Sequence, residues 1–269
     1  MLREYARFEK KGENEKEAFA RLYEIVKVLR VKCPWDSVQT HDSLRTCMIE
    51  EAYEAVDAIQ REDTDNLREE LGDVLLQVIF HGILAEEEES FTLTDVINEE
   101  CEKMLRRHPH IFSGEEVKGI DKALEKWDNM KSTEHGQTTY TDRLKSVPDA
   151  LPALIKSNKV QSRAAKAGFD WDSIDGAFDK VSEELAEVKE AYAFGFCDEV
   201  YEELGDLLFS VVNVARFAGA DPEDALNAAT RKFIERFSRV EEAASRMGKR
   251  MDSMSLDELD ALWENVKNK

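Results

Sequence analysis

An internal repeat is the feature of this 269-residue sequence that most restricts its fold. Each copy contains a Trp-Asp-Ser tripeptide, a Glu-Glu-x-x-Glu motif, a Glu-Glu-Leu-Gly-Asp motif and then an apolar stretch. These segments are residues 35–37, 50–54, 69–73 and 74–80 in the first copy and 171–173, 183–187, 202–206 and 207–212 in the second. The last Glu of the first motif and the second Glu of the next are 16 positions apart in both copies. Order, spacing and residue type are preserved together, so we expect one structural unit to occur twice.

The repeat predicts two tandem domains. We place the N-terminal domain at residues 1–130, with an N-terminal extension at 1–21, and the C-terminal domain at 150–269. Residues 131–149 are polar and lack helical periodicity, so we interpret them as a linker.

Hydrophobic spacing predicts that both domains are helical bundles, which makes the fold class all-α. In the first copy Leu44, Met48 and Ala55 recur at helical spacing, and 12 Gly and 5 Pro are too few for a turn-rich β protein. The stretches 74–80 and 207–212 are apolar nearly all round. Such helices lie inside a bundle or at a subunit interface, so we expect a dimer.

Carboxylates recur on the apolar faces of these helices. Glu51 lies at helical spacing from Met48 and Ala55, where a lone ionised carboxylate would cost several kcal/mol of desolvation. In each copy two i,i+3 acid pairs share a face, and packing the two helices would bring four carboxylates together. The two sets are Glu51, Glu54, Glu70 and Asp73, and Glu184, Glu187, Glu203 and Asp206. With oxygen donors and no His or Cys, both sets favour Mg²⁺, with Mn²⁺ as the alternative.

A glycine stands between the acids of the second motif in each copy. Gly72 and Gly205 each carry a helix-interior cost of about 1 kcal/mol relative to Ala. Close helix packing is the explanation we favour, and room for a metal-bound phosphate is the functional alternative.

Charge and cysteine content limit the function further. The formal net charge is −21, which repels nucleic acid, so we expect no nucleic-acid partner and expect any nucleotide site to require cations. The four cysteines show no CxxC spacing, and neither a signal peptide nor a membrane-spanning stretch is evident. We therefore expect a cytoplasmic protein with no membrane partner.

Several segments together carry a family resemblance. The Glu-x-x-Glu and Glu-x-x-Asp pairs in a duplicated helical chain resemble the MazG nucleotide pyrophosphohydrolases. The other similar segments are residues 33–36 (CPWD), 106–112 (RRHPHIF), 168–171 (GFDW) and 232–237 (KFIERF). The resemblance covers residues 22–268.

The resemblance implies an all-α homodimer that hydrolyses NTPs, including ATP, or dNTPs to the monophosphate and pyrophosphate, with the C-terminal half as the usual active domain. Carried over by position, Glu184, Glu187, Glu203 and Asp206 would be catalytic and hold Mg²⁺, and the first-copy acids form a second candidate set. The implied nucleotide contacts are Lys180, Glu183, Lys232, Arg236 and Trp263. Taken without the resemblance, Lys232 and Arg236 favour surface ion pairs and Trp263 favours packing.

Two alternatives to a broad NTP pyrophosphohydrolase remain open at this point. One is an all-α dUTP or dCTP diphosphatase with a narrow substrate range, since such enzymes share the carboxylate bundle. The other is a metal-dependent regulatory module that binds nucleotides without hydrolysing them.

Overall fold

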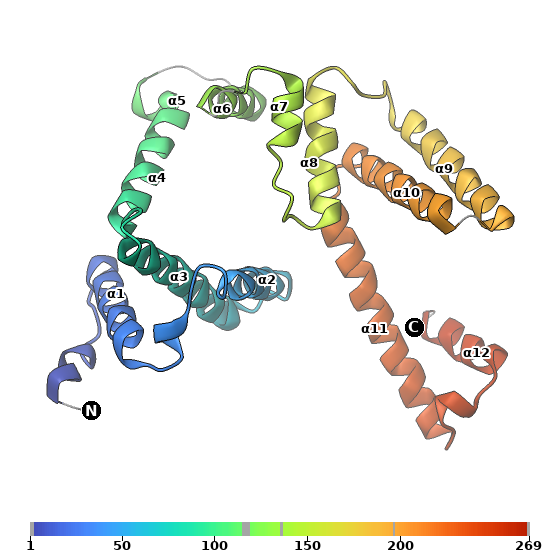
Figure 1. The fold of residues 1–269 in the computed structure, drawn as a ribbon. Coiled ribbons are helices and arrows are strands. Elements are labelled where there is room, and N and C mark those ends of the chain that lie inside the picture. The colour runs from blue at the N-terminus through green and yellow to red at the C-terminus, as the bar shows by residue number, and fades with distance from the viewer. Residues whose placement is uncertain (1–2, 115–118, 135–136, 196, 268–269) are drawn as a thin grey trace. The chain divides into compact units, whose positions relative to one another are not determined.

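The structure, a computed structural model, describes residues 3–114, 119–134, 137–195 and 197–267 (Figure 1). Within these ranges the regular elements are helices, with no strand, so the predicted all-α class is confirmed. The chain forms two compact units, residues 1–127 and 128–269. No helix among the described residues is long and apolar enough to cross a membrane.

The first unit is built around a helical hairpin. Its elements are η1 (Arg3–Phe8), α1 (Glu15–Lys32), η2 (Asp36–Val38), α2 (Arg45–Gln60), α3 (Thr64–Glu87), α4 (Leu93–Arg107) and α5 (Pro109–Phe112). Helix α6 (Ile120–Glu134) spans the boundary between the units. Asp63 caps α3 by accepting a hydrogen bond from the Asn66 backbone N–H, so the turn after α2 leads directly into the next helix.

The core of the first unit joins α1, α3 and the start of α2. Val26, Leu44 and Ile79 are fully or almost fully buried there, and Phe19 of α1 packs against the same cluster. Helix α1 begins at Glu15, inside the segment we predicted as an N-terminal extension. Residues 15–21 of the predicted extension are thus part of a helix that helps to form the core.

The second unit repeats the hairpin and adds long helices on either side. Its elements are α7 (Tyr140–Lys145), α8 (Ala153–Lys166), α9 (Ile174–Phe194), α10 (Cys197–Phe217), α11 (Pro222–Arg246), η3 (Met251–Ser253) and α12 (Leu256–Lys267). Helix α9 ends at Phe194 and is capped by Gly195, whose left-handed φ of 77° allows the chain to turn toward α10. Gln161 of α8 donates from Nε2 to the Phe209 carbonyl at 2.7 Å, which fixes α8 against α10.

The predicted linker at 131–149 is not a linker in the structure. It contains the end of α6 and the whole of α7, and it belongs to the second unit. Thr139 and Asp142 form a capping box that starts α7, and the Arg163 guanidinium of α8 donates to the Arg143 carbonyl. The short helix was missed because capping and tertiary contacts stabilise it, whereas it is too short to show an apolar period.

The apolar stretches 74–80 of α3 and 207–212 of α10 are only partly buried within one chain. Ile79 and Val212 are buried, whereas Leu75, Leu208 and Val211 remain exposed. Part of the apolar surface of α3 and α10 is therefore left uncovered.

Candidate active site

In the second unit, the facing sides of α9 and α10 bring carboxylates together. Helix α9 supplies Glu184 and Glu187, and α10 supplies Glu203. One oxygen from each of these three side chains lies within 4.8 Å of the others. Asp206, one turn after Glu203, lines the same pocket as Glu184. The structure therefore brings three of the four predicted acids within 4.8 Å of one another, and the fourth, Asp206, lines the adjoining pocket.

Burial and mutual repulsion act on this carboxylate cluster. Glu184 is 4% exposed, and its Oε1 lies 2.5 Å from Nζ of Lys180, one turn earlier on α9. Desolvation, followed by the charge of Glu184, raises the pKa of both Glu187 and Glu203. Hydrogen bonds to Glu184 and Glu183 raise the pKa of Lys180, so its ammonium stays charged. The site is an anionic cluster that a bound cation would stabilise.

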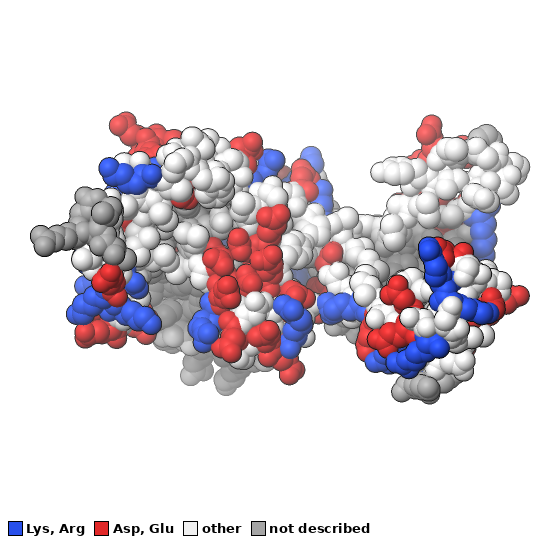
Figure 2. All heavy atoms as spheres, turned by 90° about the horizontal axis from the view of Figure 1, so that it is seen from below, with Lys and Arg blue, Asp and Glu red and all other residues white. Residues whose placement is uncertain are grey.

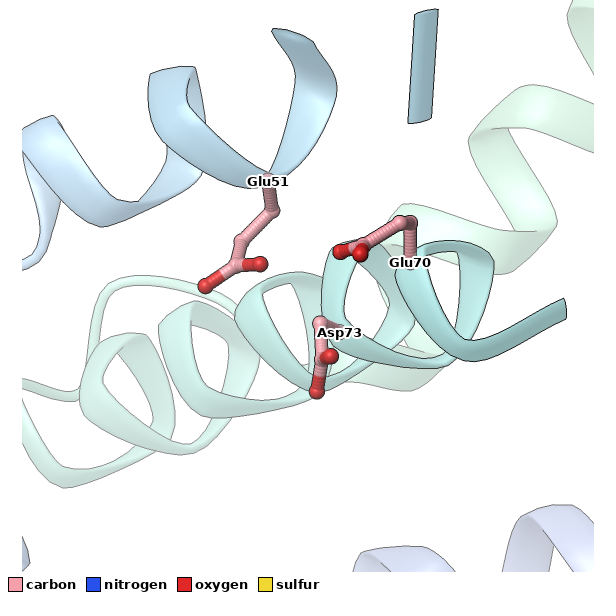
Figure 3. Close-up of side chains that lie close together, drawn as sticks. All are labelled: Glu51, Glu70 and Asp73. Carbon is pink, nitrogen blue, oxygen red and sulfur yellow. The ribbon is translucent and has the colours of Figure 1, made fainter. Parts of the chain in front are cut away.

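The first unit holds a similar cluster. Glu51 of α2 points toward Glu70 and Asp73 of α3 (Figure 3), and one oxygen from each lies within 4.8 Å of the others. Desolvation, with Asp73 next, raises the pKa of Glu51, and desolvation and then Glu54 raise that of Glu70. Acidic side chains gather on the face of this unit that is seen in Figure 2, over the α2–α3 pair.

The two clusters differ in the cations around them. Cys47 stands where the second copy has Lys180, so the first cluster lacks this lysine. Arg107, the counterpart of Arg236, is 6% exposed and its guanidinium lies 5.4 Å from the ring centroid of Trp127. Lys103, the counterpart of Lys232, pairs with Glu100. Lys103 is thus held in an ion pair on its own helix, and Arg107 is buried beside Trp127.

A pocket of about 640 Å³ adjoins the carboxylates of the second unit. Its lining residues include three charged side chains (Glu184, Asp206 and Lys180) and four apolar ones (Phe169, Trp171, Phe209 and Val160). Its size is that of an ordinary small-molecule site. The segment GFDW carried the family resemblance, but its aromatic residues were not among the predicted site residues. The predicted site residues were chosen mainly from charged side chains at helical spacing. Phe169 and Trp171 lie in the segment before α9, where no helical spacing marks them.

An ion pair lines another part of the pocket. Arg216 of α10 bonds Asp170 at 2.5 Å and Oδ1 of Asn213 at 2.8 Å. The side chains of Arg216 and Asp170 are 16% and 26% exposed, so this pair is largely shielded from solvent. These groups provide hydrogen-bonding partners beside the aromatic wall.

The structure contradicts close helix packing, the explanation that we favoured for Gly72 and Gly205. A Cβ built on either glycine would meet no atom within 4 Å, apart from the helix's own backbone and chain neighbours. Neither glycine is therefore required for close packing within the chain. Gly205 lies between Glu203 and Asp206 in sequence, but successive helical residues point about 100° apart, so it faces away from the side of α10 that carries both acids.

Three of the predicted nucleotide contacts lie on other elements of the second unit. Lys232 and Arg236 are on α11, and Trp263 is on α12, where its ring packs against Phe233 with centroids 5.1 Å apart. None of the three is among the described residues that line the 640 Å³ pocket. Within one chain, Trp263 is a packing residue between α11 and α12. Lys180 and Glu183, by contrast, form an ion pair at 3.0 Å beside the carboxylates.

Comparison with known proteins identifies the family. Residues 39–112 and 175–240 match the model described as the MazG nucleotide pyrophosphohydrolase domain, so each copy of the repeat contains one match. The chain is 42% identical over 251 residues to the nucleoside triphosphate pyrophosphohydrolase/pyrophosphatase MazG of Thermotoga maritima, covering 93% of this chain and 95% of that protein. It is 40% identical over 237 residues to the nucleoside triphosphate pyrophosphohydrolase of Escherichia coli K12, covering 87% and 90%.

A solved structure is also similar. The crystal structure of a MazG-related protein from Thermotoga maritima matches 42% of this chain and 98% of its own, at 28% identity and a TM-score of 0.38. The family assignment rests on the domain model and on the two full-length relatives. Both copies match that model, and the relatives align over nearly the whole chain: the protein belongs to the MazG nucleotide pyrophosphohydrolase family.

Proposed function

We propose that this chain hydrolyses nucleoside triphosphates, ribo or deoxy, to the monophosphate and pyrophosphate, and that the second unit carries out the reaction. One observation carries the proposal. The carboxylates of Glu184 and Asp206 line the same pocket as Phe169 and Trp171, so phosphates bound through a cation and a flat base both find partners in it. The two relatives at about 40% identity, both named as nucleoside triphosphate pyrophosphohydrolases, support the same activity.

The donor set fits a divalent cation. Glu184, Glu187, Glu203 and Asp206 offer only hard oxygen ligands, and desolvation together with repulsion raises the pKa of Glu187 and Glu203. We propose that these four acids hold Mg²⁺, with Mn²⁺ as the alternative. When bound, the cation supplies charge neutralisation for the triphosphate and polarises the α-phosphate for attack by water.

The chain's own groups position the reactants. Lys180 is held beside the acids by Glu183 and Glu184, from where its ammonium can donate hydrogen bonds to phosphate oxygens. A water oxygen bonds to the α-phosphorus while the bond from that phosphorus to the α,β-bridging oxygen breaks. The water proton passes to a carboxylate of the cluster or to solvent, and pyrophosphate leaves.

We propose that the aromatic side chains of the pocket bind the nucleotide base. Phe169 and Trp171 offer ring faces against which a base can stack, and the Asp170–Arg216 pair offers donors and acceptors close by. Stacking accepts any base, so these walls support a broad substrate range rather than a narrow dUTP or dCTP specificity.

We propose that the protein works as a homodimer in the cytoplasm. Tyr201 is 83% exposed and Tyr192 78% exposed on the α9–α10 pair, and such aromatic side chains are typical of covered interfaces. All four cysteines are free, as suits a reducing compartment.

Hydrolysis in ¹⁸O-labelled water tests the proposal. Each NTP and dNTP is incubated with the full chain in Mg²⁺ or in EDTA, and the products are identified by mass spectrometry. We expect pyrophosphate only with the metal, and ¹⁸O in the monophosphate, because attack at the α-phosphorus places the solvent oxygen there. Label in pyrophosphate, release of orthophosphate, or nucleotide binding without turnover would each contradict the proposal.

A further inference from the structure

A second pocket in this unit is lined by cations although the whole chain carries a net charge of −21. It measures about 650 Å³ and lies among the end of α6, α7 and α8. Its lining residues are Lys131, Gln137, Asp142, Lys145, Ser146, Pro148, Lys159 and Arg163. Four side chains are cationic and one is acidic, so the pocket has the opposite sign to the molecule as a whole.

The single acid of this pocket is already used by the backbone. Asp142 accepts hydrogen bonds from the Thr139 backbone N–H and the Thr138 hydroxyl as part of the α7 cap, and these bonds help to lower its pKa. No ion pair in the described part of the chain involves Lys145 or Lys159. Their charges are therefore not neutralised by a neighbouring carboxylate.

Arg163 is oriented toward this pocket by its own hydrogen bonds. Its Nη1 donates to the Arg143 carbonyl and, at 2.8 Å, to the Ser146 hydroxyl. Among the described residues it makes no other hydrogen bond, so Nε and Nη2 remain as donors on a fixed guanidinium. Lys159 lies four residues earlier on α8, on the same face. A held guanidinium with two uncompensated lysines is an arrangement suited to phosphate oxygens.

The cationic pocket and the proposed substrate pocket share α7 and α8. Lys159 and Arg163 line the first, while their sequence neighbours Val160 and Ala164 line the second. On α7, Lys145 lines the cationic pocket and its neighbour Leu144 lines the proposed substrate pocket. Consecutive helical residues point about 100° apart, so the two pockets lie on adjacent faces of the same helices.

We propose that the cationic pocket binds a phosphate polyanion, of the pyrophosphate or nucleotide polyphosphate class, without a metal ion. A concave site of this volume fits a small polyanion, whereas a nucleic acid would need an extended basic surface that a chain of charge −21 does not offer. The inference does not depend on the proposed hydrolysis, because none of its residues belongs to the carboxylate cluster.

Titration calorimetry in EDTA tests this inference, because without a metal the carboxylate cluster repels phosphates. Pyrophosphate, orthophosphate and ATP are titrated into the wild type, the double variant Lys145→Gln/Lys159→Gln, and Lys156→Gln. Lys156 is the matched control, since it lies on α8 outside the pocket and pairs with Asp149. We expect the wild type to bind pyrophosphate more tightly than orthophosphate. We also expect the pyrophosphate affinity to fall about tenfold or more in the double variant and to stay unchanged in Lys156→Gln.

Three outcomes would overturn the inference. They are no pyrophosphate binding by the wild type at millimolar concentration, equal weakening in the control, and loss of binding in Lys180→Gln, which removes the cation beside the carboxylates. The last would place the anion in the substrate pocket. The ATP arm separates a nucleotide from free pyrophosphate as the better ligand. The double variant should still hydrolyse NTPs, so failure here is distinguishable from failure of the proposed function.

Discussion

The Nζ atom of Lys180 lies 2.5 Å from Oε1 of Glu184, one turn further along α9. Glu184 is buried, so this cation offsets a carboxylate charge that water cannot reach. In the first unit the corresponding pair is Cys47 and Glu51, and Cys47 carries no positive charge to offset that carboxylate. This difference leads us to assign the chemistry to the second unit, although both units assemble acids.

Replacing Lys180 tests that assignment. Lys180→Gln removes a donor beside the phosphates and leaves Glu184 unpaired, so kcat/KM for NTP hydrolysis should fall by about tenfold or more. Lys189→Gln on the same helix, outside the cluster, is the control. Steady-state pyrophosphate release measures both variants, and equal activity in the two would remove Lys180 from the mechanism.

Gly205 is expected to separate stability from activity. Gly205→Ala meets no neighbouring atom, so the free energy of unfolding should rise by up to about 1 kcal/mol through the better helix propensity of alanine. Hydrolysis should be retained, because the new methyl group points away from the helix face that carries Glu203 and Asp206. Gly72→Ala should gain similar stability and keep its activity. Thermal melts and rates for both variants check this, and a destabilised Gly205→Ala protein would show that the glycine serves packing.

The carboxylate cluster should give the metal-free protein a specific pH dependence. Because folding raises the pKa of Glu187 and Glu203, the folded state holds protons there that the unfolded chain has lost. This contribution to stability is present below the unfolded pKa of about 4.5 and is lost as the pH rises through the raised values.

Melting in EDTA from pH 4.5 to 7.5 measures this effect. Glu203→Gln should melt higher than the wild type at pH 7.5 and lose less stability across the range, while no longer gaining the full stabilisation from Mg²⁺. Glu190→Gln removes one charge from α9 outside the cluster and should follow the wild type. If both variants shift alike, general surface repulsion rather than the cluster is responsible.

Trp171 should act on substrate binding. Removing its ring in Trp171→Ala takes away a stacking wall, so KM should rise by about tenfold with a smaller change in kcat. Trp35, the counterpart in the first copy, provides the control Trp35→Ala. Rates at several ATP concentrations distinguish the two parameters, and an unchanged KM for Trp171→Ala would place the base elsewhere.

The sequence predicted the elements whose signals are periodic or repeated. Helices α9 and α10, with Glu184 facing Glu203, follow from acids at i,i+3 spacing on an apolar stripe. The pocket walls could not be predicted in this way, because Phe169 and Arg216 come from segments 47 residues apart and meet only through tertiary packing. Helix α7 was missed for a related reason, since its stability comes from its cap and from α8.

Burial was the weakest part of the prediction. Met48 lies on the predicted apolar stripe yet is 38% exposed, because helical spacing identifies a face without showing how much of it a neighbour covers. Lys232, Arg236 and Trp263 came from the resemblance alone and lie outside the pocket of a single chain, so their role in nucleotide binding stays a prediction.

Steady-state pyrophosphate release by four carboxylate variants tests the central claim most directly. With Mg²⁺ and saturating ATP, Glu184→Gln and Glu203→Gln should lose about 10²-fold or more of the activity, because each removes a cation ligand. Glu51→Gln and Glu70→Gln, their counterparts in the first unit, should retain a substantial fraction, with circular dichroism confirming that all four are folded. Inactive Glu51 and Glu70 variants beside active Glu184 and Glu203 variants would contradict the assignment of the reaction to the second unit.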